Sequence, residues 1–168
     1  MAVEICRYNP RIQFIIIDSV YAWENYRSIL PKNVHVIHID PENESALNKI
    51  INFAFEHKAF VIIDEFHLFP YAKFGKIREL ILAGGNRGVG WMGITQFTSL
   101  IPKSVIGNAN KVFLFANHEF NVVQYTWETF GIEPEKIQKL KDYYFYYFKD
   151  FRFVLNNKGE LQEFHLKL

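Results

Sequence analysis

Two acidic residues directly follow an apolar run near the middle of the chain. Phe60–Ile63 is apolar throughout, and Asp64 and Glu65 come next. Such a run is typical of a central strand in a parallel sheet, buried on both faces. Because ligands of these sheets bind beyond the carboxyl ends of the strands, both acids would stand within reach of a ligand. In nucleotide hydrolysis the first acid would direct Mg²⁺ and the second would polarise the attacking water. The alternative is a strand that merely ends in a charged loop.

Two further polar residues are candidates for the same chemistry. Gln96 ends the strand expected next along the chain, where it could orient a water or contact a γ-phosphate, or be a plain polar strand end. Arg87 stands in a glycine-rich passage at 84–93. It could reach across a subunit boundary as an arginine finger, or simply be solvated.

A phosphate-binding loop is not recognisable in the sequence. Such a loop needs glycines followed by a lysine and a hydroxyl residue, at the start of a helix that follows a strand. The passage at 84–93 leads into a strand instead, and no Lys-Ser or Lys-Thr pair directly follows it. We therefore interpret it as a loop.

Other chemistries stay open as alternatives. Asp64, Glu65 and His67 could hold a metal, although the paired spacing of a zinc site is missing. Asp18 together with the two acids could serve a metal-dependent nuclease. The tyrosines of the aromatic stretch that begins at Tyr143 could stack on single-stranded nucleic acid, or simply pack a hairpin.

Composition points to one folded domain. The chain has 168 residues, of which 49% are apolar, so a substantial core is expected. Nineteen basic and eighteen acidic side chains nearly balance, which gives no sign of a nucleic-acid-coating protein. The single cysteine, Cys6, excludes an internal disulfide and an all-cysteine zinc site. No signal peptide or membrane-spanning run is visible, so an intracellular setting is expected.

Apolar runs and helical spacing predict alternating strands and helices, and hence an α/β class with a mainly parallel sheet. The predicted strands are 12–17, 34–39, 60–63, 91–95 and 111–116, and the predicted helices are 44–58, 74–83, 119–130 and 134–142. No clear period marks the first ten residues. Gly84-Gly85 suits a left-handed helix end.

The C-terminal residues predict an antiparallel hairpin at a sheet edge. One strand would lie in the aromatic stretch 143–155 and the other in 161–168, where apolar residues alternate. Asn156–Gly159 would form the turn between them.

Taken in order, several segments resemble the HerA/FtsK superfamily of P-loop DNA-pumping ATPases. Phe60–His67 resembles its Walker B strand, and Gly93–Gln96 is similar to its strand ending in isoleucine–threonine–glutamine. The other matching segments are Ile15–Asp18 with Trp23-Glu24, Lys76–Ile81, Asn86–Gly90, Ile101-Pro102 and Asn108–Phe113.

The resemblance implies a three-layer RecA-like domain, 1–168, with a core at 12–142 and the hairpin at 143–168. By position, Asp64 would direct Mg²⁺, Glu65 would be the catalytic base, Gln96 the γ-phosphate sensor and Arg87 a trans-acting finger. ATP and Mg²⁺ would be the cofactors. DNA and further copies of the chain, or a partner chain, would be the partners. The protein would act in the cytoplasm, or, if viral, in the host cytoplasm or the virion.

The chain departs from this family at its start. The family places the phosphate loop before Ile12, where eleven residues stand. We therefore expect a degenerate ATPase-like domain, serving DNA handling, genome packaging or assembly, with weak or no hydrolysis. An active ATPase whose phosphate loop comes from another chain, and an interaction scaffold without nucleotide, are the alternatives.

Overall fold

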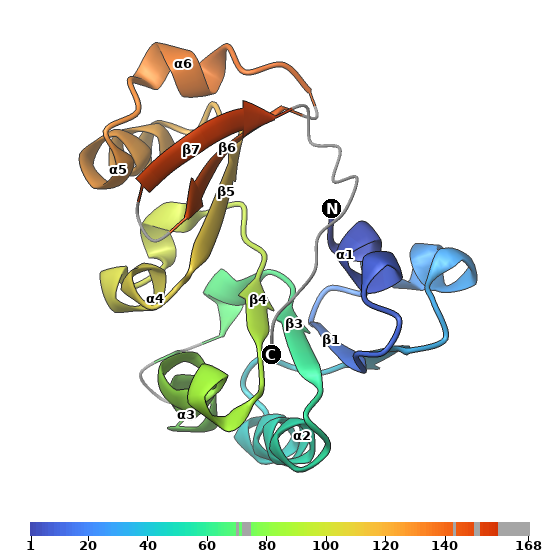
Figure 1. The fold of residues 1–168 in the computed structure, drawn as a ribbon. Coiled ribbons are helices and arrows are strands. Elements are labelled where there is room, and N and C mark those ends of the chain that lie inside the picture. The colour runs from blue at the N-terminus through green and yellow to red at the C-terminus, as the bar shows by residue number, and fades with distance from the viewer. Residues whose placement is uncertain (70, 72–74, 143, 150–151, 158–168) are drawn as a thin grey trace. The chain divides into compact units, whose positions relative to one another are not determined.

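The structure is a computed structural model that describes residues 1–69, 71, 75–142, 144–149 and 152–157, the last of these as backbone only. These residues group into two compact units, Met1–Gln96 and a unit that begins at Phe97. Each unit has a sheet of its own (Figure 1). The division into a core at 12–142 and a hairpin at 143–168 stays a prediction.

The first unit is built on a four-stranded parallel sheet in the order β2-β1-β3-β4. Every residue of the two central strands is buried, as expected where both faces of a sheet are covered. The prediction of an α/β fold with a mainly parallel sheet is confirmed. The strands are β1 (Phe14–Asp18), β2 (Val34–His38), β3 (Phe60–Ile63) and β4 (Trp91–Gly93).

The register brings the carboxyl ends of the central strands level with one another. Ile17 of β1 pairs with Ile63 of β3, and Ile63 pairs with Gly93 of β4. The residues that follow this level therefore meet at one edge of the sheet. They include Asp18, which ends β1, and Asp64, which follows β3.

Helices connect these strands. Asn43 caps the start of helix α2, because its side chain accepts a hydrogen bond from the N–H of Ala46. Helix α2 packs beside α3. Helix α1 was not predicted, because a seven-residue helix that buries Ile5 and Cys6 is too short to show a helical period. The helices of this unit are α1 (Ala2–Tyr8), α2 (Glu44–His57), α3 (Gly75–Ala83) and 3₁₀ helices at Glu24–Ile29, Phe66–Leu68 and Gly85–Arg87.

The predicted left-handed helix end at Gly84-Gly85 is wrong. Gly84 is right-handed, and the left-handed glycine of this passage is Gly88, with φ of 72°. Gly84 is required for another reason: a Cβ there would lie 2.3 Å from the carbonyl oxygen of Leu80 and 2.6 Å from that of Val89. The glycine therefore allows the backbone at Val89, which leads into β4, to pass close to the end of α3.

The second unit contains an antiparallel sheet in the order β5-β6-β7. Its strands are β5 (Lys111–Phe115), β6 (Phe145–Lys149) and β7 (Arg152–Asn157). A C-terminal antiparallel hairpin is confirmed, but it pairs with β5 rather than lying at the edge of the parallel sheet. Both of its strands lie within 145–157, whereas the prediction placed one in 143–155 and the other in 161–168. The predicted turn is wrong, because Asn156 and Asn157 pair with Tyr146 and Phe145 inside the ladder. The predicted strand at 161–168 lies outside the described residues.

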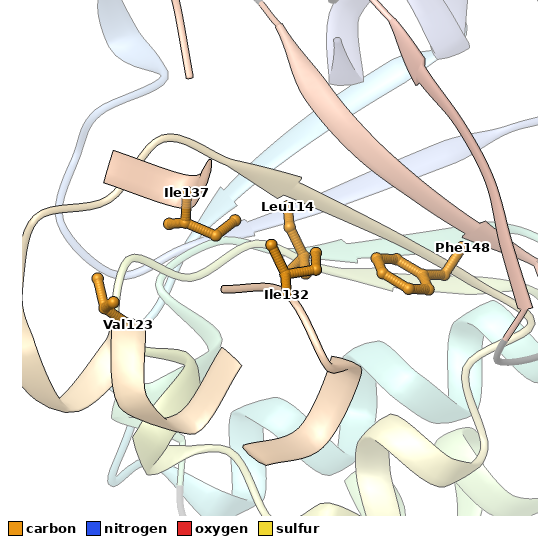
Figure 2. Close-up of a cluster of buried hydrophobic side chains, with 5 residues drawn as sticks. All are labelled: Leu114, Val123, Ile132, Ile137 and Phe148. Carbon is orange, nitrogen blue, oxygen red and sulfur yellow. The ribbon is translucent and has the colours of Figure 1, made fainter. Parts of the chain in front are cut away.

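Helices and β5–β6 enclose a small core in this unit. Figure 2 shows its buried members, which are Leu114, Val123, Ile132, Ile137 and Phe148. Gly131, left-handed at φ of 70°, ends α5. The helices are α4 (Lys103–Gly107), α5 (Phe120–Phe130), α6 (Pro134–Gln138) and a 3₁₀ helix at Thr98–Leu100. Across the described parts of the chain, no helix is long and apolar enough to cross a membrane.

Candidate functional site

The chain turns sharply at the acid pair. The N–H of Asp64 still donates to the carbonyl of Ile17, at 3.0 Å, as a continuation of the sheet. Glu65 then adopts a left-handed conformation with φ of 46° and ψ of 49°. The next N–H, of Phe66, donates to the carbonyl of Ile94 at 2.8 Å. A non-glycine residue in this conformation costs roughly 1–2 kcal/mol, and such residues cluster at functional sites.

Gln96, three residues beyond the end of β4, lies beside Glu65, which follows β3. The Gln96 side-chain amide donates to Glu65 Oε1 at 3.1 Å. Gln96 is exposed to solvent, whereas the Glu65 side chain is only 19% exposed. The base and sensor roles of these two residues stay predictions.

The second oxygen of Glu65 is in a different environment. Glu65 Oε2 is buried and accepts no hydrogen bond from any residue that the structure describes. It lies 3.4 Å from Nδ1 of His67, which is 3.0 Å from the hydroxyl of Thr95. One carboxylate oxygen is thus engaged by Gln96, while the other keeps its capacity to accept a proton or a hydrogen bond.

Asp64 is held by a tryptophan from a distant part of the chain. The indole Nε1 of Trp23 donates to Asp64 Oδ2 at 2.8 Å, and the N–H of Glu65 donates to Oδ1 at 3.1 Å. Trp23 is 8% exposed. Each oxygen of a carboxylate has two lone pairs, so each oxygen of Asp64 can accept one further bond.

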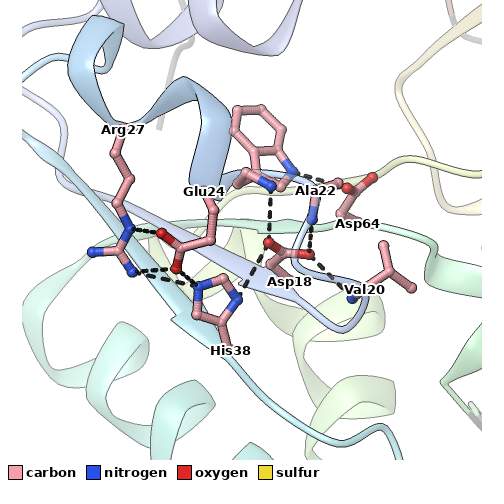
Figure 3. A network of polar contacts seen from close by, with 8 residues as sticks. Asp18, Val20, Ala22, Glu24, Arg27, His38 and Asp64 are labelled. Atoms are coloured by element: carbon pink, nitrogen blue, oxygen red, sulfur yellow. Dashed lines mark hydrogen bonds and ion pairs between the residues drawn. The ribbon is translucent and has the colours of Figure 1, made fainter.

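Asp18 fixes the loop that carries Trp23 (Figure 3). It is fully buried at the end of β1. Its Oδ1 accepts hydrogen bonds from the N–H groups of Val20 at 3.2 Å and Ala22 at 3.3 Å, and its Oδ2 accepts from that of Trp23 at 3.0 Å. These contacts make Asp18 a structural acid, which weakens the nuclease hypothesis that needs it at a metal.

A chain of charged groups extends this network toward the surface. His38 lies between Asp18 Oδ2, at 3.3 Å, and the carboxylate of Glu24, whose other oxygen is 2.7 Å from Nε of Arg27. The hydrogen bond from Arg27, followed by that from His38, lowers the pKa of Glu24. Tyr21, left-handed at φ of 58°, stacks on the His38 ring with centroids 4.4 Å apart.

Arg87 lies at the amino-terminal ends of the strands, opposite the ends that carry the acid pair. It precedes β4, and its carbonyl accepts a hydrogen bond of 2.6 Å from Lys58, which precedes β3. Its guanidinium pairs with Glu79 and lies 3.8 Å from the centre of the Phe55 ring. Because β3 and β4 are parallel, Arg87 stands at their amino ends and does not meet the acid pair. Its predicted role as a trans-acting finger stays a prediction.

The acid pair fits a hydrated divalent cation. Within the described ranges, no three side chains of His, Cys, Asp or Glu converge to hold a metal directly, so a zinc-type site gains no support. Mg²⁺ usually keeps several waters and needs one or two carboxylates. Each oxygen of Asp64 keeps a lone pair that can accept a hydrogen bond from such a water.

Trp23 is the site residue that sequence reasoning missed. It lies 41 positions from Asp64, and no local pattern connects the two. The only available signal is its place beside Glu24, in the segment that resembles the family's strand after the phosphate-loop helix.

Comparison with known proteins identifies the fold. No protein-family model and no curated protein matches the chain. Among solved structures, the genome packaging NTPase B204 from Sulfolobus turreted icosahedral virus 2, in complex with AMP, is similar with a TM-score of 0.73 and 19% identity. The match covers 93% of this chain and 87% of that one. B204, the DNA-packaging ATPase from Sulfolobus Turreted Icosahedral Virus, matches with a TM-score of 0.70 and 20% identity over 88% and 82% of the two chains. This chain therefore has the fold of the viral genome-packaging NTPases.

Proposed function

We propose that this chain is an NTPase-like domain of the genome-packaging type, whose carboxyl-edge acids form the water-activating half of a nucleotide site. The observation that carries the proposal is the hydrogen bond between Gln96 and Glu65, beside Asp64, at the carboxyl edge of the parallel sheet. The likeness to B204, solved with AMP, ATP-gammaS and AMPPCP, supports a nucleotide as the ligand.

Asp64, Glu65 and Gln96 have roles that agree with their contacts, whereas the role of Arg87 rests on the resemblance alone. Asp64 would accept hydrogen bonds from waters of a Mg²⁺ ion, which supplies charge neutralisation on the phosphates. Glu65 would take the proton of the attacking water. The amide of Gln96 would hold Glu65 Oε1 and orient the water or the γ-phosphate. Arg87 would act on the nucleotide of a neighbouring subunit.

We expect the isolated chain to hydrolyse ATP weakly or not at all. Most of the affinity for β- and γ-phosphates in this class comes from the backbone amides and the lysine of a phosphate loop. No Gly-Lys-Ser or Gly-Lys-Thr triplet occurs in the 168 residues. A partner chain that supplies this loop is the second candidate, favoured by the hydrogen bond that joins Gln96 to Glu65 beside Asp64.

The test compares ATP binding and hydrolysis by the chain alone and by the chain mixed with phosphate-loop proteins from the same genome. Glu65→Gln keeps the shape but removes the base, so it should lower any hydrolysis by about 10²-fold or more. Glu128→Gln is the matched control, because Glu128 is an exposed glutamate that also accepts a hydrogen bond from a glutamine. Micromolar binding with turnover by the chain alone would refute the degenerate version. A complete lack of ATP binding in every mixture would refute the nucleotide site.

We further propose DNA and other copies of the chain as partners, and the host cytoplasm or the virion as the place of action. The description of B204 as a DNA-packaging ATPase supports this. Light scattering of the chain with and without duplex DNA and Mg·ATP tests it. A monomer that ignores DNA in all conditions would contradict this part of the proposal.

A further inference from the structure

We propose that Trp23 is a positioning residue for Asp64, whose indole N–H fixes the carboxylate so that its remaining lone pairs face the water shell of a divalent cation. This inference rests on the proposed function and deepens it. It concerns a residue from the β1–β2 connection, whereas Asp64 follows β3.

The hydrogen bond between Trp23 and Asp64 is suited to orienting the carboxylate. Trp23 Nε1 lies 2.8 Å from Asp64 Oδ2, and the indole is almost fully buried. An indole N–H donates only and does not release its proton at ordinary pH, so it orients the carboxylate without exchanging a proton with it. With the Glu65 N–H on Oδ1, both oxygens are fixed, and rotation of the carboxylate about its own axis is blocked.

Trp23 is anchored at its other end as well. Its backbone N–H donates to the fully buried Asp18, which also accepts from the N–H groups of Val20 and Ala22. His38 closes the network on the outer side of Asp18 (Figure 3). The loop is therefore tied to the end of β1, and the indole connects the ends of β1 and β3.

A second partner that orients a metal-directing group contributes strongly to metal binding. Loss of such an outer partner typically lowers metal affinity by about 10–100-fold. Trp23→Phe retains a large aromatic ring but removes the N–H. It should therefore weaken cation binding while keeping most of the packing.

The first experiment is a titration of the full chain with Mn²⁺, as a probe for Mg²⁺, followed by the electron paramagnetic resonance of the free ion. We expect Asp64→Asn to remove the site and Trp23→Phe to raise the Kd for Mn²⁺ by about tenfold or more. Trp127→Phe is the matched control, because Trp127 is 53% exposed and lies in the second unit. It should leave the Kd unchanged.

A second measurement does not depend on the Trp23 variant folding. The chain has three tryptophans, so ¹⁵N labelling gives three indole N–H signals. Asp64→Asn should shift the Trp23 signal and leave that of Trp127 in place. Substoichiometric Mn²⁺ should broaden the Trp23 signal first in the wild type.

The outcomes separate this inference from the proposed function. If Asp64→Asn loses Mn²⁺ binding but Trp23→Phe binds as tightly as the wild type, the inference is overturned and the proposed function stands. An unchanged Trp23 signal in Asp64→Asn also overturns the inference alone. If the wild type binds no Mn²⁺ and no indole signal broadens, the cation role of Asp64 fails, and the inference fails with it.

Discussion

The hydrogen bond from Gln96 to Glu65 makes the two oxygens of the glutamate inequivalent. The bond engages one oxygen of the acid and leaves the other, beside His67, without a hydrogen-bond partner in the described part of the chain. The two oxygens therefore differ in what they can accept.

Gln96→Ala should affect chemistry more than stability. Because Gln96 is exposed and its bond is neutral on the donor side, the free energy of unfolding should change by less than about 1 kcal/mol. Wherever the wild type hydrolyses ATP, alone or with a partner, the rate should fall by about tenfold or more. The matched control is Gln124→Ala, which removes another exposed glutamine–glutamate bond, of 2.9 Å. Equal rates for the two variants would contradict the sensor role.

Asp18→Asn should behave in the opposite way. The substitution places an NH₂ group opposite backbone N–H donors, so part of a buried network loses its acceptor. We expect a loss of about 2–3 kcal/mol in the free energy of unfolding, measured by urea denaturation. If Asp18 instead held a catalytic metal, as the nuclease hypothesis requires, the wild type should cleave plasmid DNA with Mn²⁺ and Asp18→Asn should not.

Sequence reasoning found the acids and Gln96 because a strand's carboxyl end can be read from an apolar run followed by polar residues. It could not find the contact of Trp23 with Asp64, since that contact depends on how the β1–β2 loop folds back. Arg87 shows the same limit: its loop was recognised, but only the parallel sheet shows which edge it occupies.

At the scale of elements, the parallel strands and α2 were predictable because each buries a regular pattern. β1 is apolar up to Asp18 and β3 is apolar throughout, and α2 buries Leu47, Ile51 and Ala54 along one face. β7 was not predictable in its bounds. Asn156 and Asn157 favour turns, but pairing with β6 overrides that local preference.

Gly84→Ala should destabilise the protein, although the position is right-handed. The added Cβ would meet two carbonyl oxygens closer than 3 Å, and backbone must move to relieve this. We expect a loss of about 1–3 kcal/mol, typical of overpacking. Gly85→Ala is the ideal comparison, because a Cβ there meets nothing within 4 Å. Thermal unfolding of both variants tests this, and similar melting temperatures would contradict the close approach.

At the scale of the whole molecule, the chain groups into two compact units. The first unit contains the candidate site, from Asp18 to Gln96, entirely within its own residues. Its integrity can therefore be followed by a probe placed within it.

Cys6 is such a probe. It is fully buried, and burial raises the pKa of its thiol to about 12 from an ordinary value of 9.0. The pKa of the thiol is higher in the folded chain than in the unfolded chain. Ionisation of Cys6 therefore leaves the free energy of unfolding unchanged below pH 9.0 and lowers it as the pH rises toward about 12. At pH 8 a thiol reagent should label the folded chain only through opening of the structure.

Labelling should thus be slow in buffer and fast in denaturant. If Mg·ATP binds the first unit, saturation at 100 times Kd should slow labelling through global opening by about 100-fold. Rapid labelling of the native chain at pH 8 would contradict the burial of α1.

The left-handed backbone at Glu65 lowers the stability of the fold in exchange for the position of a carboxylate. Glycine would occupy this conformation without steric cost, so Glu65→Gly should melt no lower than Glu65→Ala and at least as high as the wild type, as calorimetry can check. The backbone therefore accepts a cost of roughly 1–2 kcal/mol to present a carboxylate, rather than a bare turn, beyond the end of β3.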